Sequence, residues 1–208
     1  MADGQSLSAS HQPRTEVQGV APRLLTVDDL LALSAARVFI EGEKVELIDG
    51  RLYVSPSEGS QHLTGSGRVN ECLGALLRST GLDSEWWLIP NLSLRISDTR
   101  LLQPDWAIVR RGVLEIEKRL PGPDDLALAI EIADTSLRFD EGDKKELYAE
   151  AGLGEYWVLR LGPGNLRVCR EPEGGLYKVD HVLERGEHIR PLLSQGAAIA
   201  VNDLLGPG

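Results

Sequence analysis

Residues 126–133, Leu-Ala-Leu-Ala-Ile-Glu-Ile-Ala, form a short apolar run that one carboxylate, Glu131, interrupts. A run of this length favours a β-strand that is buried on both faces. A second run, Asp-Trp-Ala-Ile-Val at residues 105–109, begins with another carboxylate, Asp105. Carboxylates avoid buried sheets unless they are paired or bound to a metal. We therefore expect these two strands to carry a functional site as well as part of the core.

The segment after the first run has helical periodicity. Residues 140–151 are expected to form a helix that Gly152 ends, with one stripe made of Asp140, Lys144, Leu147, Tyr148 and Ala151. The next strand is expected at residues 156–161. A strand, a helix and a strand in succession imply at least one parallel pair of strands.

The clearest hairpin signal lies nearer the N-terminus. Two apolar strands, at residues 45–48 and 51–54, flank the dipeptide Asp49-Gly50. Asp-Gly in this position favours a two-residue type I′ turn. The hairpin implies antiparallel neighbours beside the parallel pair.

The remaining periodic segments complete the expected fold. A long helix that ends near Gly81 is expected to pack through Leu63, Ser66, Val69, Asn70, Leu73, Leu76 and Leu77. Further strands of the same sheet are expected at residues 86–89 and 92–96, and a later meander at 166–169 and 176–179. The predicted fold class is α/β or α+β, a mixed β-sheet flanked by helices.

Length and composition predict one domain. The chain has 208 residues, of which 42% are apolar, so residues 23–208 are expected to form a single domain. Residues 1–22 are rich in Ser, Gln, Gly and Pro and are expected to be a disordered tail. Only two cysteines occur, and there is no signal-peptide pattern or membrane-length apolar stretch. We expect a cytoplasmic protein that does not interact with membranes.

The net charge of −10 argues against a simple basic surface for nucleic acid, because Lys and Arg supply most non-specific affinity for phosphate. Surface charges are screened beyond about 8 Å at physiological salt. A locally basic cleft remains an alternative, built from Arg95, Arg100, Arg110, Arg111 and Arg138.

Two carboxylates and a nearby ammonium are what metal-dependent phosphodiester hydrolysis needs. Asp105 and Glu131 are candidate ligands of a divalent cation, and Lys144 is a candidate stabiliser of charge on the phosphate. Each has a structural alternative. Asp105 follows a proline at a strand entrance, where an aspartate is an ordinary turn residue. Glu131 could pair with an arginine, and Lys144 could form an ion pair with Asp140.

Two further residues are weaker candidates. Glu46, in the first hairpin, is a candidate metal ligand or a partner for substrate water. His62, near the start of the long helix, is a candidate hydrogen-bond donor to a phosphate or a candidate proton relay, although a histidine there is more often a cap or surface residue. There is no phosphate-binding glycine loop, nucleophile elbow or zinc cluster.

The order and spacing of these motifs resemble the Uma-type putative restriction endonuclease family, a branch of the PD-(D/E)XK nuclease superfamily. The resemblance rests on Val45-Glu46-Leu47-Ile48-Asp49-Gly50, Ser55-Pro56 followed by His62, Gln103-Pro104-Asp105, Glu131-Ile132-Ala133-Asp134-Thr135-Ser136, Asp140 with Lys144 and Tyr148, and Gly154-Glu155-Tyr156-Trp157. It implies a restriction-endonuclease-like core, DNA as substrate, and Mg²⁺ or Mn²⁺ bound by Asp105 and Glu131. The superfamily's usual lysine position is Ala133 here, and Lys144 is the residue that matches its role.

Two functions follow from this resemblance and from the residues. The first is a metal-dependent DNA endonuclease in which Asp105 and Glu131 bind the metal, Lys144 stabilises the transition state and Glu46 assists. The second is a catalytically inactive nuclease-like protein that acts as a binding or regulatory module. Cleavage of both strands of a two-fold substrate favours a homodimer, with residues 197–205 and the C-terminal meander as a candidate interface.

Overall fold

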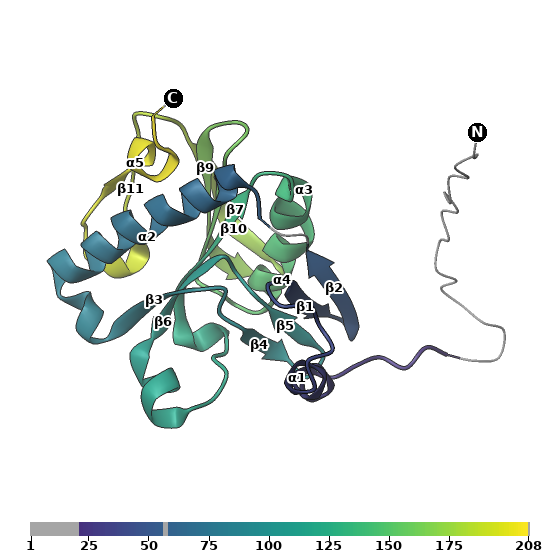
Figure 1. Cartoon of the computed structure of the whole chain (residues 1–208). Helices are drawn as coiled ribbons and strands as arrows, with labels where there is room; N and C mark the ends of the chain where they lie inside the picture. The colour runs from purple at the N-terminus through teal and green to yellow at the C-terminus, as the bar shows by residue number, and fades with distance from the viewer. Residues whose placement is uncertain (1–20, 56–57, 208) are drawn as a thin grey trace, which may run out of the picture.

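The computed structural model describes residues 21–55 and 58–207 (Figure 1). The tail expected at residues 1–22 lies outside the described residues except for its last two. The expectation of a single domain over residues 23–208 stays a prediction.

A six-stranded sheet forms the centre of the protein, with the strand order β10-β9-β8-β7-β6-β3. Its members are β3 (Trp86–Pro90), β6 (Trp106–Arg110), β7 (Leu126–Ala133), β8 (Glu155–Arg160), β9 (Asn165–Glu173) and β10 (Leu176–Leu183). Strands β7 and β8 are parallel, and the other neighbours are antiparallel. The mixed sheet confirms the predicted fold class.

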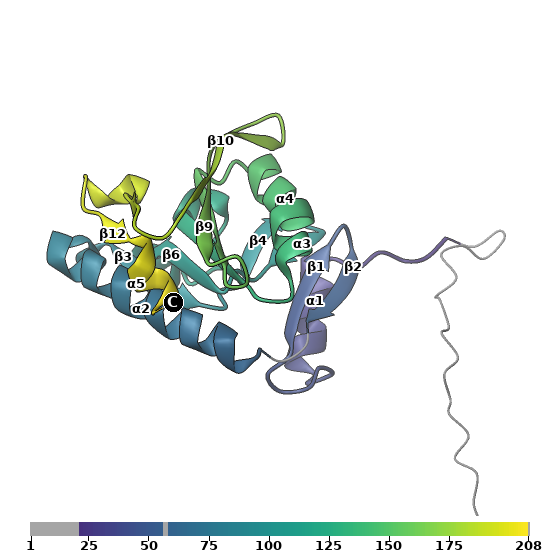
Figure 2. The same ribbon diagram turned by 90° about the horizontal axis from the view of Figure 1, so that it is seen from above.

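Helices cover both faces of this sheet, as Figures 1 and 2 show. One face packs against α2 (Ser60–Thr80) and α5 (Val201–Leu205), and the other against a helical segment made of α3 (Leu137–Phe139), η4 (Asp140–Lys144) and α4 (Lys145–Glu150). Strand alternation divides the apolar residues between the two layers. Trp106 and Ile108 face α2, whereas Ala107 and Val109 face the other layer.

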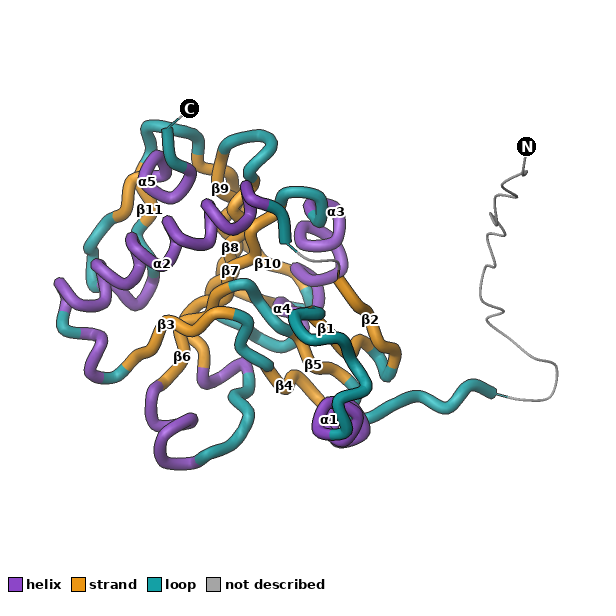
Figure 3. Tube along the Cα trace, viewed as in Figure 1, coloured by secondary structure: helices purple, strands orange, loops and turns teal. Residues whose placement is uncertain are grey.

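The first hairpin belongs to a second sheet of four strands, ordered β2-β1-β5-β4 (Figure 3). Its strands are β1 (Lys44–Ile48), β2 (Arg51–Ser55), β4 (Leu94–Ser97) and β5 (Arg100–Leu102), and α1 (Val27–Ala35) packs on it. Asp49 and Gly50 have φ of 49° and 75°, so the predicted type I′ turn is confirmed. The expectation that residues 92–96 join the large sheet was wrong, because the short, unpredicted β5 pairs β4 with β1 instead.

The long helix α2 ends where predicted, since Gly81 adopts a left-handed conformation with φ of 73°. Its buried stripe begins with His62 and Gly65 rather than with Leu63, which is 60% exposed. A Cβ on Gly65 would lie 3.2 Å from a methyl group of Ile132, so a glycine permits the close approach of helix and sheet. Leu63 lies one residue, about 100°, away from His62 around the helix. The packing face therefore presents the histidine to the sheet.

The C-terminal segment is part of the core. Ile199, Val201 and Leu204 are buried beside α2, next to the two-stranded ribbon of β11 (His188–Ile189) and β12 (Ile199–Ala200). The 3₁₀ turns η1 (Leu82–Ser84), η3 (Pro123–Asp125) and η5 (Leu192–Ser194) and the π-helical turn η2 (Val113–Glu117) connect the larger elements. Three residues of the segment 197–205 are thus committed to the fold, and its role in a dimer interface stays a prediction.

Candidate functional site

The two predicted carboxylates lie opposite each other on the central strands. Asp105 directly precedes β6, Glu131 lies within β7, and the neighbouring pair Trp106 and Ile130 are in register. Both side chains are buried. Two positions 26 residues apart in the sequence therefore form one site at one end of the strand pair.

Asp105 is held by three partners. Its Oδ2 atom accepts a hydrogen bond from the Ile132 amide at 2.7 Å and lies 3.0 Å from Nε2 of His62, and its Oδ1 atom lies 2.6 Å from Nζ of Lys44. Burial alone would raise the pKa of Asp105. The hydrogen bond with His62 and the charge of Lys44 outweigh that effect and hold the pKa well below its usual range. Asp105 is therefore ionised.

Glu131 is bound by two lysines and a tyrosine rather than by an arginine. Its Oε1 atom accepts hydrogen bonds from Nζ of Lys144 at 2.9 Å and from the Tyr148 hydroxyl at 3.3 Å, and its Oε2 atom lies 3.3 Å from Nζ of Lys44. Burial raises the pKa of Glu131, and the charges of Lys144 and Lys44 oppose that rise. An additional positive charge would stabilise its ionised form.

Lys144 points into the site from the last residue of the π-helical turn η4. Its side chain is 3% exposed and contacts Glu131 and also Oε1 of Glu46 at 3.1 Å. Its ammonium lies 5.5 Å from the centre of the Phe139 ring. The alternative of an ion pair with Asp140 is wrong, because the Asp140 carboxylate instead accepts a hydrogen bond from Ser136. Single π-helical turns are frequent at functional sites.

Glu46 is fully inside the site and only half satisfied. Its Oε1 atom accepts a hydrogen bond from the Gln103 amide at 2.8 Å. Its Oε2 atom is buried and has no hydrogen-bond partner among the described residues. An unpartnered buried carboxylate oxygen is costly and indicates room for a cation or an ordered water.

Two residues of the site were missed by sequence reasoning. Lys44 lies two positions before Glu46 on the same strand, so strand alternation places both side chains on one face. Glu58 lies four residues before His62, and its Oε2 atom is 3.1 Å from Nδ1 of that histidine. The i, i+2 and i, i+4 spacings were available signals. Glu58, His62 and Asp105 offer ligand atoms within 4.8 Å of one another.

His62 is buried between the carboxylates of Glu58 and Asp105. The alternative of a surface residue or helix cap is therefore wrong. Burial lowers the pKa of His62, but the hydrogen bond to Asp105 and the charges of Asp105 and Glu58 raise it above its usual value. The histidine can exchange a proton at the side of Asp105.

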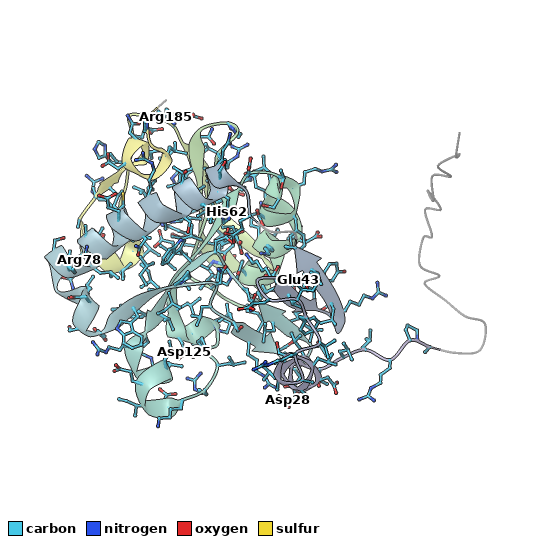
Figure 4. The ribbon with its side chains drawn as sticks, viewed as in Figure 1. Asp28, Glu43, His62, Arg78, Asp125 and Arg185 are labelled. Atoms are coloured by element: carbon cyan, nitrogen blue, oxygen red, sulfur yellow. The ribbon has the colours of Figure 1, made fainter. Side chains whose placement is uncertain are left out.

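A cleft of about 900 Å³ beneath the N-terminal turns of α2 is lined by Lys44, His62, Asp105, Glu131 and Lys144 (Figure 4 labels His62 and Glu43, which both line it). Glu43, Glu58 and Asp134 add acidic groups to its lining, and no arginine lines it among the described residues. Of the arginines considered for a basic cleft, Arg95, Arg100, Arg110 and Arg111 form ion pairs elsewhere, and Arg138 does not line it. The alternative of a locally basic cleft built from these arginines does not hold for this cleft.

The buried charges do not balance. Four buried carboxylates, those of Glu46, Asp105, Glu131 and Asp140, face the two ammonium groups of Lys44 and Lys144. If all four carboxylates are ionised and His62 is neutral, two negative charges remain uncompensated. The oxygen-rich donor set and this excess fit a hard divalent cation.

Comparisons with known proteins agree with this fold. The chain is similar to the crystal structure of a putative nuclease belonging to DUF820 from Anabaena variabilis ATCC 29413, with a TM-score of 0.67 and 16% identity, over 87% of this chain and 97% of that chain. No curated protein matches it. The family model Uma2, described as a putative restriction endonuclease, matches residues 27–202. The chain therefore belongs to the Uma2 family of putative restriction endonucleases.

Proposed function

We propose that this protein is a metal-dependent endonuclease that hydrolyses phosphodiester bonds of DNA. The observation that carries the proposal is the convergence of Asp105 Oδ1 and Glu131 Oε2 on one cationic group, with Lys144 bound to the other oxygen of Glu131. The family match supports a nuclease-like activity.

Asp105 and Glu131 would hold Mg²⁺ or Mn²⁺, with Glu46 as a further carboxylate. When bound, the cation supplies a water of lowered pKa as nucleophile and positive charge for the phosphate. Mg²⁺ and Mn²⁺ both favour the carboxylate oxygens that this site offers. Either cation would offset the two negative charges that full ionisation of the four buried carboxylates leaves.

The residues of the chain would divide the remaining work. The Ile132 amide and His62 hold Asp105 in one orientation, and Lys144 and Tyr148 hold Glu131. Lys144 also lines the cleft, so its ammonium can stabilise negative charge that develops on a phosphate there. His62 would exchange a proton with the reacting groups.

The acidic cleft makes the alternative function specific. An inactive binding or regulatory module would retain the fold and the acidic lining without turnover. A nuclease must instead offset the repulsion between DNA and Glu43, Glu58 and Asp134, and a bound cation does so. Binding of DNA only in the presence of a divalent cation therefore favours the nuclease.

The decisive experiment measures cleavage of plasmid and single-stranded DNA with Mg²⁺, Mn²⁺ or a chelator, alongside Mn²⁺ titration calorimetry. Wild type is expected to bind Mn²⁺ and cleave, and Asp105→Asn and Glu131→Gln are expected to lose both properties while remaining folded. Mn²⁺ binding that persists undiminished in both variants would remove the site assignment. Mn²⁺ binding without any cleavage would favour the inactive module.

We propose in addition that the protein is a homodimer and acts in the cytoplasm. A two-fold enzyme most simply cuts both strands of a two-fold substrate. Leu176 and Val182 of the C-terminal meander are exposed and remain available for an interface. The two cysteines are both free thiols, which suits a reducing compartment. A monomeric mass by light scattering at micromolar concentration would contradict the dimer.

A further inference from the structure

Lys44 has an unusual position among the charged residues of the site. It is the first residue of β1, and its ammonium contacts one oxygen each of Asp105 and Glu131, at 2.6 Å and 3.3 Å. No other lysine among the described residues bridges these two carboxylates. The bridge joins the two groups that are proposed to hold the divalent cation.

An ammonium and a divalent cation compete for such a position. A cation bound by Asp105 Oδ1 and Glu131 Oε2 would lie about 2.0–2.6 Å from each oxygen. Lys44 Nζ would then be a positive charge only a few ångströms away, and the two would repel each other strongly in a poorly solvated site. The bridge and the bound cation therefore exclude each other.

Lys44 also has space beside it. Its side chain is 15% exposed and lines the cleft of about 900 Å³, so its flexible stem has space to swing outward. Lys144, in contrast, is 3% exposed and is held by Glu46, Glu131 and the Phe139 ring. The two lysines thus differ in exposure, although both contact Glu131 and line the cleft.

We infer that Lys44 is an internal counter-ion that occupies the cation position of the metal-free protein, holds Asp105 and Glu131 together, and is displaced when a divalent cation binds. The inference rests on the cation site of the proposed function. Lys44 is a positioning residue, because it acts through the two carboxylates. It explains how two buried carboxylates stay close together in the absence of a metal.

The test is Mn²⁺ binding to Lys44→Met, which keeps the length of the side chain and removes its charge. The dissociation constant for Mn²⁺ should fall about tenfold or more, because the cation no longer displaces a charge-assisted hydrogen bond. The rise in melting temperature on addition of saturating Mn²⁺ should also be larger than in wild type. Lys44→Arg should weaken Mn²⁺ binding, because a guanidinium can bridge two carboxylates more firmly.

Lys145→Met is the matched control. Its ammonium pairs with Asp180, 3.0 Å away, so the variant changes the net charge equally without touching the site. If Lys44→Met unfolds without metal, Mn²⁺-dependent recovery of its circular dichroism supports the inference, and Lys44→Arg still supplies the opposite shift.

Several outcomes would overturn the inference. These are an unchanged Mn²⁺ affinity in Lys44→Met, an equal change in Lys145→Met, or no Mn²⁺ binding by any variant. None of these measurements uses DNA. Tighter Mn²⁺ binding by Lys44→Met, together with no DNA cleavage by wild type, would support the inference about Lys44 and contradict the nuclease. DNA cleavage by wild type, together with an unchanged Mn²⁺ affinity in Lys44→Met, would support the nuclease and contradict the inference.

Discussion

Asp105 and Asp125 are two buried aspartates at opposite ends of the β6–β7 pair, and their surroundings differ. Asp125 accepts hydrogen bonds from Arg119, Arg110 and the Gly122 amide, with Arg119 Nη1 at 2.6 Å. Hydrogen bonds from Arg119 hold the pKa of Asp125 below its usual range. The partners of Asp105 lower the pKa of Asp105 in the same way. A lowered pKa is therefore common to both regions.

Charge balance and access separate them. Around Asp125, the two arginines face only one further carboxylate, that of Glu117, so positive and negative charges are equal in number. Around Asp105, four buried carboxylates face two lysines, and three of the four, those of Asp105, Glu131 and Asp140, line the cleft. A perturbed pKa by itself marks structural ion pairs as readily as functional sites. An excess of buried negative charge beside a cleft is the more informative sign.

The largest expected effect comes from exchanging the two aspartates for asparagine. Asp105→Asn should abolish divalent-cation binding and metal-dependent cleavage, because it removes the charge of a proposed ligand. Asp125→Asn should leave both unchanged. The comparison is checked by Mn²⁺ calorimetry and a cleavage assay on both variants, and equal losses would show that the two regions do not differ in function.

The second comparison sets Lys144 against its neighbour Lys145. Lys144→Ala should lower the cleavage rate about 10²–10³-fold, the usual cost of losing one preorganised electrostatic contact, while Mn²⁺ binding persists. It should also destabilise the fold by about 3–5 kcal/mol, because it breaks a buried ion pair. Lys145→Ala, which loses only the contact with Asp180, should change the rate little. Single-turnover cleavage and thermal melts measure the two effects, and similar rates in both variants would leave Lys144 as a structural residue.

The third comparison concerns acid stability. Asp125→Asn should lower the free energy of unfolding at pH 7 by about 1–2 kcal/mol, because it removes charge-assisted hydrogen bonds. The loss is limited because the arginine partners of Asp125 are half exposed. The pKa of Asp125 is lower in the folded than in the unfolded protein, so its contribution is present above the unfolded value, about 3.9, and is lost as the pH falls further. Urea unfolding at neutral and acidic pH should show the difference between variant and wild type shrinking in acid. If the difference in unfolding free energy between Asp125→Asn and wild type is the same at both pH values, the loss of stability comes from packing and not from the charge of Asp125.

The smallest expected effect tests the acidic lining of the cleft. Asp134→Asn should tighten cation-dependent DNA binding about two- to threefold, equivalent to about 0.5 kcal/mol, because it removes one exposed negative charge from the cleft. Asp83→Asn, on an exposed turn after α2, makes the same charge change outside the cleft. Fluorescence anisotropy at two salt concentrations measures both, and the advantage should shrink at higher salt. Equal gains in both variants would point to net charge alone.

Local pattern was enough to predict the strands and the turn. The alternation along residues 105–109 and 126–133 places Asp105 with Ala107 and Glu131 with Ala129, and the structure confirms both strands. Asp49-Gly50 likewise predicted its own backbone conformation. Such signals are local, since backbone sterics and side-chain periodicity involve residues a few positions apart.

Long-range packing decided the contents of the site. Lys44 contacts Glu131 across 87 positions of the chain, and no local pattern records such an encounter. The position of β4 also depends on which segments pair, because the short β5 pairs with both β4 and β1 and so places β4 in the second sheet. The positions of the arginines outside the cleft likewise depend on long-range packing. The carboxylates could be predicted because they begin or interrupt apolar runs. The lysine that bridges them could not be predicted, because it comes from a distant segment of the chain.

The amino-acid sequence by itself determined the mixed sheet, the first hairpin that carries Glu46, and the two carboxylates that interrupt or begin apolar runs. Only the tertiary structure decided that these carboxylates meet beside one acidic cleft, with Lys44 between Asp105 and Glu131 and with Lys144 between Glu131 and Glu46. The physical reason is that periodicity sets which way a side chain points, whereas the neighbour it meets depends on the packing of segments that are far apart in the chain.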